Sequence, residues 1–200
     1  KGLDLIEVDG FRPDCKSTAH GHPTGPDSAV AQMDALIEVF SAWRKARPGI
    51  LISLSSGSNP SPFWLEHVDF VGRGDAQEAP GGEGDPFDRN ATFIDGGLQV
   101  HRPTEMPISA FAVADLAAPI LAGTSDAAFE RNVWWLVART SLQHSWQLEA
   151  RDLAPERWKV LERAVRWGKS HERLFRSSRM VGGDSRRGSL YGFSAFDAGG

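Results

Sequence analysis

The sequence has only one cysteine, Cys15, among its 200 residues, so no disulfide bond can form within the chain. It also has no apolar run near the ~18 residues that a membrane-spanning helix needs. Gly57 is not followed by the Gly-Lys-Ser/Thr of a phosphate-binding loop, and Ser55 and Ser56 lack the Gly-x-Ser-x-Gly elbow of a hydrolase nucleophile. These absences argue against a membrane span, a phosphate cradle and a serine nucleophile.

Neither sign of charge dominates the composition. The formal net charge is -4 at pH 7 and the isoelectric point is about 5.9. We therefore expect neither a nucleic acid nor a membrane surface as a partner. The length is sufficient for one domain with a core of its own. The chain begins at Lys1 and shows no secretory signal, but it also lacks an initiating methionine, so the sequence leaves the compartment open.

Tyrosine is as scarce as cysteine, whereas tryptophan occurs seven times. Tryptophan rings can stack on sugars, although core packing is their commoner use. Most of the tryptophans fall in helical patterns, and we expect these in the core. Trp64 lies in a turn between two expected strand ends, so it is the tryptophan that we expect to line a pocket.

Short apolar segments alternate with helical patterns along the first half of the chain. Residues 5–8 predict a strand buried on both faces. After the N-cap pair Asp27-Ser28, apolar residues at helical spacing predict a helix, which Pro48-Gly49 ends. Further strands are predicted over 50–54 and 68–71.

The second half continues the same pattern with less regular spacing. Residues 76–88 predict a loop rich in glycine, proline and acidic residues, and 89–102 are ambiguous, with a short helix before a strand as the interpretation. The sequence then predicts a strand over 106–113, helices that begin at Ser125-Asp126 and at Pro155, and a last strand over 189–196.

The repeated order of strand, loop and helix predicts a parallel α/β architecture. We count about five barrel-type strands, whereas a (β/α)8 TIM barrel has eight in ~250 residues. The sheet is therefore either open, or part of a barrel whose front is missing.

Two aspartates follow strands of this expected sheet. Asp9 comes after the first strand and Asp75 after the third. The carboxyl ends of barrel strands carry the chemistry, so the two carboxylates could converge on one bond. Glycosidases use such a pair, about 5 Å apart in retaining enzymes and farther apart in inverting ones. Two unrelated turn aspartates are the alternative.

Glu7 complicates this site because residues two apart in a strand face the same side. Glu7 and Asp9 would repel each other, and one of them would titrate at a raised pH unless a cation lies nearby. Arg12 and Arg73 are candidates for that cation, and a basic group from outside this chain is the alternative.

A loop with Cys15, His20 and His22, next to Asp14, contains residue types that bind zinc. The spacing lacks a clear further ligand, so we favour a loop whose histidines hydrogen-bond to substrate or backbone. The polar run from Ser55 to Asn59 includes Gly57. Its side chains could bind sugar hydroxyls, or they could bond to the backbone of their own turn, and the two interpretations are equally supported.

These residues together resemble the α-galactosidase-like (melibiase) group, glycoside hydrolase family 36 and its clan D relatives. The quoted segments are Val8-Asp9-Gly10-Phe11, Cys15 with His20-Gly-His22, Gly25-Pro-Asp-Ser28, Ser61-Pro-Phe-Trp-Leu65, Val68-Asp69, Gly72-Arg-Gly-Asp75, Glu156-Arg-Trp158, Trp167, Gly182-Gly-Asp184 and Tyr191-Gly-Phe193. The resemblance implies that residues 1–200 are the C-terminal part of a (β/α)8 catalytic barrel, covering strands 4 to 8. The upstream strands and a downstream β-sandwich would then lie outside this chain.

The resemblance also implies a retaining glycoside hydrolase that acts on α-galactosides or related α-linked glycosides. Asp9 would be the nucleophile and Asp75 the general acid/base, with an oligosaccharide or glycoside as partner and neither a metal nor a cofactor. Glu7 stands where the family has lysine, and Gly72 where it has tryptophan. The alternative is a non-catalytic carbohydrate-binding barrel derived from such an enzyme. We expect the substrate to contact Glu7, Arg12, Cys15, His20, His22, Ser55, Gly57, Trp64 and Arg73.

Overall fold

A computed structural model describes residues 2–54, 61–72, 85–101, 106–117 and 124–197. The chain divides into two compact units, residues 1–74 and 75–200, which we describe one at a time. Among the helices of these residues, none has both the length and the apolarity that crossing a membrane requires.

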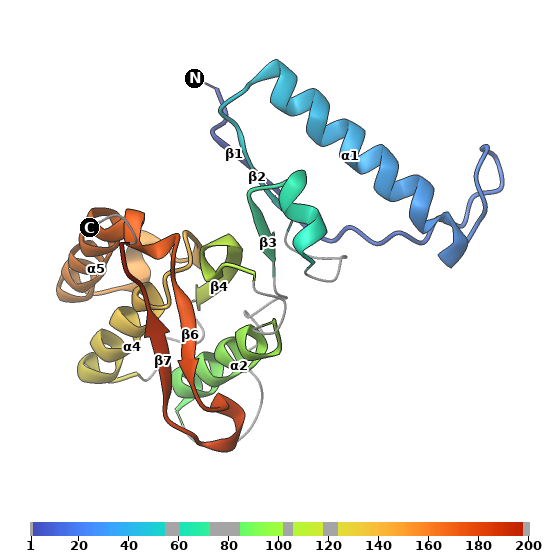
Figure 1. Cartoon of the computed structure of the whole chain (residues 1–200). Helices are drawn as coiled ribbons and strands as arrows, with labels where there is room; N and C mark the ends of the chain where they lie inside the picture. Colours follow the sequence, from blue (N-terminus) through green and yellow to red (C-terminus); the bar gives the residue numbers. More distant parts are fainter. Residues whose placement is uncertain (1, 55–60, 73–84, 102–105, 118–123, 198–200) are drawn as a thin grey trace. The chain divides into compact units, whose positions relative to one another are not determined.

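The first unit contains three parallel strands and one long helix (Figure 1). Its strands are β1 (Leu5–Val8), β2 (Leu51–Leu54) and β3 (Phe70–Gly72). Helix α1 (Ala29–Ala46) connects β1 to β2, and the short 3-10 helices η1 (Pro26–Ser28) and η2 (Pro62–Glu66) precede α1 and β3. The strands and the helix that we predicted here are confirmed in type and order.

Part of the core of the first unit lies on one face of these strands. Ile52 and Leu54 of β2 are buried, together with Phe40 of α1 and Val71 of β3. The expectation that β1 is buried on both faces is wrong, because β1 is the first strand in the sheet order and Leu5 is 40% exposed.

An ion pair ties α1 to this sheet. Asp69 accepts hydrogen bonds from Arg44 Nη2 at 3.0 Å and from the backbone N–H of Ile52 at 2.8 Å. Arg44 also donates to the carbonyl oxygens of Ile50 and His67, both at 3.3 Å. The end of the helix is thereby fixed to the starts of β2 and β3.

The second unit contains a parallel strand pair, a β-hairpin and three long helices. Its helices are α2 (Pro86–His101), α4 (Asp126–Ala138) and α5 (Pro155–Phe175). Strands β4 (Phe111–Ala117) and β5 (Gln143–Gln147) are parallel, whereas β6 (Arg179–Gly182) and β7 (Tyr191–Ser194) form an antiparallel hairpin. Short 3-10 helices are η4 (Ile108–Ala110), η5 (Ala150–Asp152) and η6 (Ser185–Arg187).

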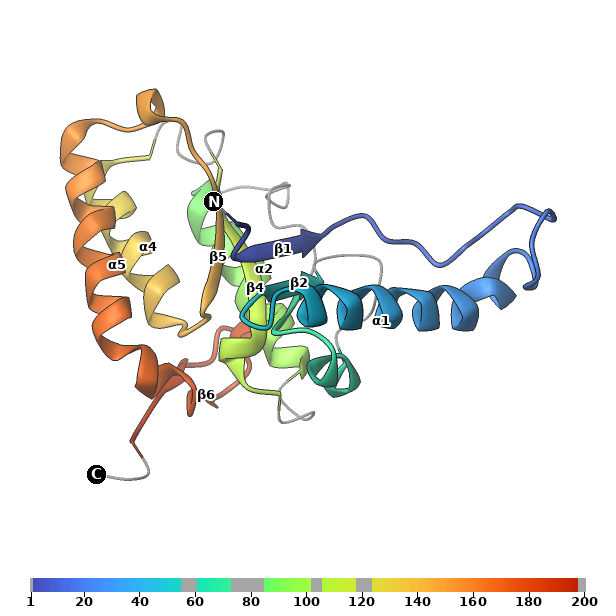
Figure 2. The same cartoon turned by 90° about the horizontal axis from the view of Figure 1, so that it is seen from above.

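Helices α4 and α5 pack side by side (Figure 2). Their shared core consists of Phe129, Val133, Leu136, Val137, Leu153, Leu161 and Ala164. The predicted starts of both helices are confirmed: the Ser125 side chain accepts a hydrogen bond from the Ala128 N–H, and Pro155 occupies the first turn of α5.

Two predictions for this unit are wrong, one strand was missed, and the last predicted strand is confirmed but with a different pairing. Residues 86–101 form one helix, where we expected a loop and then a short helix before a strand. The strand predicted over 106–113 begins only at Phe111, because residues 108–110 form a 3-10 turn after Pro107. Strand β5 was not predicted. The last predicted strand pairs with β6 as a hairpin, so it does not continue the parallel pattern.

Replacing Asp69 by alanine should lower the free energy of unfolding by about 1–2 kcal/mol, because the Ile52 N–H and the half-buried Arg44 lose their acceptor. Urea denaturation followed by circular dichroism measures the change. Asp34→Ala, at an exposed position of α1, is the matched control and should leave the midpoint nearly unchanged. An equal midpoint for both variants would contradict the structural role of Asp69.

Candidate functional site

The parallel strands of the first unit end at one edge of the sheet. In the register, Val8 lies opposite Leu54, and Leu54 lies opposite Val71. The carboxyl ends of β1, β2 and β3 therefore lie at the same edge of the sheet. In parallel α/β folds this is the edge where ligands bind.

Asp9 is the first residue after β1 and its side chain is exposed. Its Oδ1 accepts a hydrogen bond from the backbone N–H of Gly10 at 2.8 Å. Gly10 has a φ angle of 69°, in the left-handed region that favours glycine, so the chain turns sharply directly behind the carboxylate. The turn presents Asp9 at the edge of the sheet, as the sequence predicts.

Glu7 lies on the other face of the sheet from Ile52 and Leu54. It pairs with Ser53 in the register, and alternation places Leu5, Glu7 and Ser53 on the same side. Glu7 is exposed, and among the described residues it forms no ion pair. Glu7 lies two residues before Asp9, on the strand that ends at that edge.

Four of the predicted site residues lie outside the described part of the chain. They are the general acid/base candidate Asp75 and three candidate substrate contacts, Ser55, Gly57 and Arg73. The separation of the Asp9 and Asp75 carboxyl groups therefore stays a prediction. The last described residue before Asp75 is Gly72, the end of β3.

The segment between β1 and η1 brings three predicted residues together. Cys15 Sγ lies 3.2 Å from His20 Nε2, and the rings of His20 and His22 stack with centroids 4.2 Å apart. Arg12, earlier in the same segment, is exposed. The expected backbone hydrogen bond of a histidine is present, because His22 Nδ1 lies 2.7 Å from the Pro23 carbonyl oxygen. Contact of these residues with a substrate stays a prediction.

Trp64 lies in η2 and is 5% exposed. Its ring makes edge contacts with the rings of Phe63 and His67, at centroid distances of 5.4 and 6.5 Å. In the described residues this tryptophan is part of the core of the first unit, and a contact with substrate stays a prediction.

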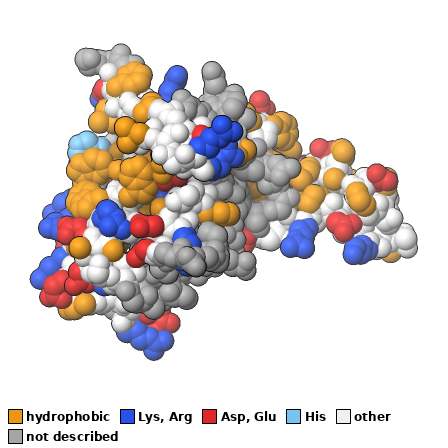
Figure 3. Space-filling model, turned by 90° about the horizontal axis from the view of Figure 1, so that it is seen from below, with side chains coloured by type: hydrophobic (Ala, Val, Ile, Leu, Met, Phe, Trp, Pro, Cys, Tyr) orange, Lys and Arg blue, Asp and Glu red, His pale blue; other side chains and the backbone are white. Residues whose placement is uncertain are grey.

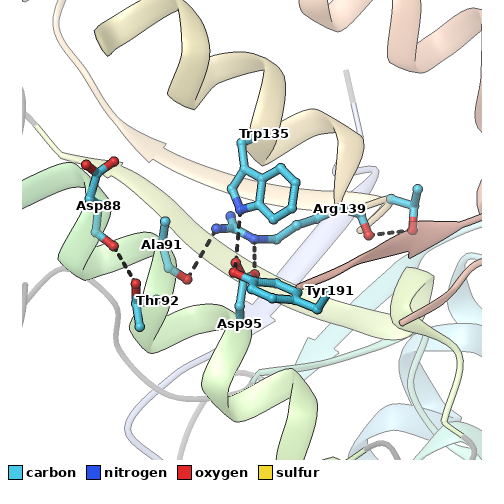
Figure 4. Close-up of polar contacts among 8 residues, drawn as sticks. Asp88, Ala91, Thr92, Asp95, Trp135, Arg139 and Tyr191 are labelled. Atoms are coloured by element: carbon cyan, nitrogen blue, oxygen red, sulfur yellow. Dashed lines mark hydrogen bonds and ion pairs between the residues drawn. The ribbon is translucent and has the colours of Figure 1, made fainter. Parts of the chain in front are cut away.

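Sequence reasoning missed a buried polar cluster in the second unit. Asp95 of α2 has no exposed surface and accepts three hydrogen bonds (Figure 4). The donors are Arg139 Nε at 2.5 Å, Trp135 Nε1 at 2.9 Å and the Tyr191 hydroxyl at 2.8 Å. Asp95 lies in α2, Trp135 in α4 and Tyr191 in β7, and Arg139 directly follows α4, so their spacing in the sequence gives no signal of their contact.

A cleft of about 500 Å³ opens beside this cluster. Its wall includes the aromatic residues Trp134, Trp135 and Tyr191, with Asp88 and Arg131 as an ion pair at 3.0 Å. Hydrophobic side chains gather on the surface of this unit at the left of Figure 3. Aromatic faces beside charged groups suit a ligand with apolar and polar faces, such as a sugar ring.

Comparisons with known proteins support the fold. Over 92% of the chain, the structure matches the galactosidase domain of the α-galactosidase-sucrose kinase AgaSK, with a TM-score of 0.60 and 15% identity. It matches the glycoside hydrolase family 36 α-galactosidase AgaA from Geobacillus stearothermophilus over 90% of the chain, with the same TM-score and identity. A raffinose complex of an AgaA variant matches with a TM-score of 0.57.

The chain spans only 23% of the length of each of these structures. No family model and no curated protein matches the sequence. The parallel strands and helices therefore fit a partial α/β barrel of the kind found in these glycoside hydrolases. At 15% identity the similarity shows the fold alone.

Tyr191 should titrate above its ordinary range in the native state. Burial, followed by the charge and hydrogen bond of Asp95, raises the pKa of its hydroxyl. Tyr191 is the only tyrosine, so the tyrosinate absorbance reports this group alone. We expect a native midpoint well above 10 and a midpoint near 10 in urea.

The raised pKa of Tyr191 fixes how the free energy of unfolding changes with pH. A pKa raised by folding gives stability that is fully present below pH 10 and is lost as the pH rises above it. The Tyr191→Phe variant removes the titrating group, so its stability should fall less between pH 9 and pH 11. A native midpoint equal to that in urea would contradict the contact with Asp95.

Proposed function

We propose that the chain is part of a retaining glycoside hydrolase that acts on α-galactosides or related α-linked glycosides. The observation that carries the proposal is the position of Asp9, exposed at the carboxyl edge of parallel strands in a chain whose fold is similar to part of an α-galactosidase domain. A neighbouring structure holds raffinose, an oligosaccharide, which supports a sugar as the substrate class.

In the proposed reaction the Asp9 carboxylate attacks the anomeric carbon. The glycosidic bond breaks as Asp75 donates a proton to the leaving oxygen, and a covalent glycosyl ester on Asp9 results. Asp75, now a carboxylate, then takes a proton from water. The water oxygen attacks the same carbon and releases Asp9, so the sugar keeps its configuration.

The position of Asp75 along the chain supports this pairing. It is the third residue in the sequence after Gly72, where β3 ends, and β3 is parallel to β2. Glu7 is exposed two residues before Asp9, and a charged side chain at this position supports a polar substrate. Arg12 and Arg73 remain the candidate cations that would keep Asp9 ionised.

Asp9→Ala should abolish turnover of unactivated α-galactosides by the full-length protein. Asp75→Ala should lower kcat on the same substrates by about 10²–10⁴-fold. Azide should restore turnover of an aryl α-galactoside by Asp9→Ala and give the β-glycosyl azide. With Asp75→Ala the azide product should keep the α configuration, because Asp9 still forms the ester.

Asp27→Ala, an exposed carboxylate of the same connecting segment, is the matched control and should keep wild-type turnover. Unchanged turnover in both the Asp9 and Asp75 variants would refute the proposed assignment. Azide products with the opposite configurations would reverse the two roles.

The second candidate function is non-catalytic sugar binding, and the aromatic cleft beside α4 favours it. If the cleft binds sugar, Trp134→Ala should weaken oligosaccharide affinity by about 10-fold or more, because a stacking contact is worth roughly 1–3 kcal/mol when an aromatic side chain is removed. Titration calorimetry measures it. Trp158→Ala, a partly exposed tryptophan of α5 outside the cleft wall, should bind normally.

Unchanged oligosaccharide affinity in Trp134→Ala, or an equal loss of affinity in both variants, would show that the cleft is not the binding site.

A further inference from the structure

The segment between Asp9 and α1 brings three potential metal ligands to one point. Cys15 Sγ and one ring nitrogen each of His20 and His22 all lie within 4.8 Å of one another. In a tetrahedral zinc site with ordinary bond lengths, ligand atoms are roughly 3.5 Å apart. The Cys15–His20 distance of 3.2 Å is already close to that value.

The backbone around Cys15 is held in place without a metal. The Gly25 N–H donates to the Cys15 carbonyl oxygen at 2.6 Å, and the Cys15 N–H donates to Ser28 Oγ at 2.9 Å. Ser28 is fully buried at the start of α1, and its hydroxyl donates to the Gly25 carbonyl oxygen at 2.6 Å. The hydroxyl of this N-cap residue thus fixes the loop, and does not cap the helix. One ligand is therefore anchored to a rigid element.

The hydrogen bond of His22 selects the tautomer that a metal needs. A carbonyl oxygen can only accept, so His22 Nδ1 donates its proton to the Pro23 oxygen at 2.7 Å. The lone pair of the neutral ring then lies on Nε2. Metal-bound histidines typically make such a bond from their other ring nitrogen, which fixes the orientation of the ring.

We infer that Cys15, His20 and His22 bind one Zn²⁺ ion. A thiolate with two imidazoles is a borderline-soft ligand set that favours zinc over magnesium or calcium. Three protein ligands leave the fourth position for water. The ion would fix the loop that follows Asp9. This inference concerns a site separate from the proposed catalytic aspartates and is independent of the proposed function.

Zinc and cobalt binding to the full chain test the inference. After removal of metal with chelator, the chain should take up one equivalent of Zn²⁺. Co²⁺ should give the visible bands of a tetrahedral site and a thiolate-to-cobalt charge-transfer band in the near ultraviolet. Cys15→Ser should remove the charge-transfer band, and His22→Gln should weaken Co²⁺ binding by more than about 100-fold. The matched control His171→Gln, a half-buried histidine of α5, should behave as wild type.

A second readout needs no variant. Cys15 is the only thiol, so its alkylation by iodoacetamide reports this site alone. One equivalent of Zn²⁺ should protect Cys15, and chelator should restore the reaction. Equal alkylation with and without Zn²⁺, or a charge-transfer band that survives Cys15→Ser, would overturn the inference. In the first case the cluster would be only a thiol–imidazole pair.

Discussion

The parallel register of β1, β2 and β3 is the constraint on which the proposed site depends. Because Val8, Leu54 and Val71 lie side by side, the chain leaves all three strands at one edge. The Arg44–Asp69 pair and the Asp69 bond to the Ile52 N–H hold α1 against these strands. Without this register, Asp9 would be an ordinary turn aspartate. With it, Asp9 stands where parallel α/β enzymes place their catalytic groups.

The second unit depends on a different interaction, the buried charge of Asp95. A buried carboxylate is tolerated only when it is paired and hydrogen-bonded, and here Arg139, Trp135 and Tyr191 supply those bonds. The cluster joins α2, β7 and the end of α4, and two of its members, Trp135 and Tyr191, line the aromatic cleft. Burial of Tyr191, followed by the charge and the hydrogen bond of Asp95, raises the pKa of its hydroxyl.

The sequence predicted the elements with strong local signals and missed those that tertiary contacts decide. β2, α1, α4 and α5 have clear apolar periodicity and caps, and they were predicted. β5, with the sequence Gln-His-Ser-Trp-Gln, has a single large apolar residue and gave no strand signal. The burial of Leu5 was overestimated because strand order decides it. Asp9 followed from its place after a strand, whereas Asp95 depends on partners up to 96 positions away.

The most direct test of the central claim is to trap the glycosyl ester that retention requires. A 2-deoxy-2-fluoro α-galactosyl reagent with a good leaving group would be incubated with the full-length protein, followed by peptide mass spectrometry. The account predicts one fluorosugar on the peptide that contains Asp9, and release of the label when a sugar acceptor is added. A stable label on another carboxylate, or inactivation without any label, would contradict it.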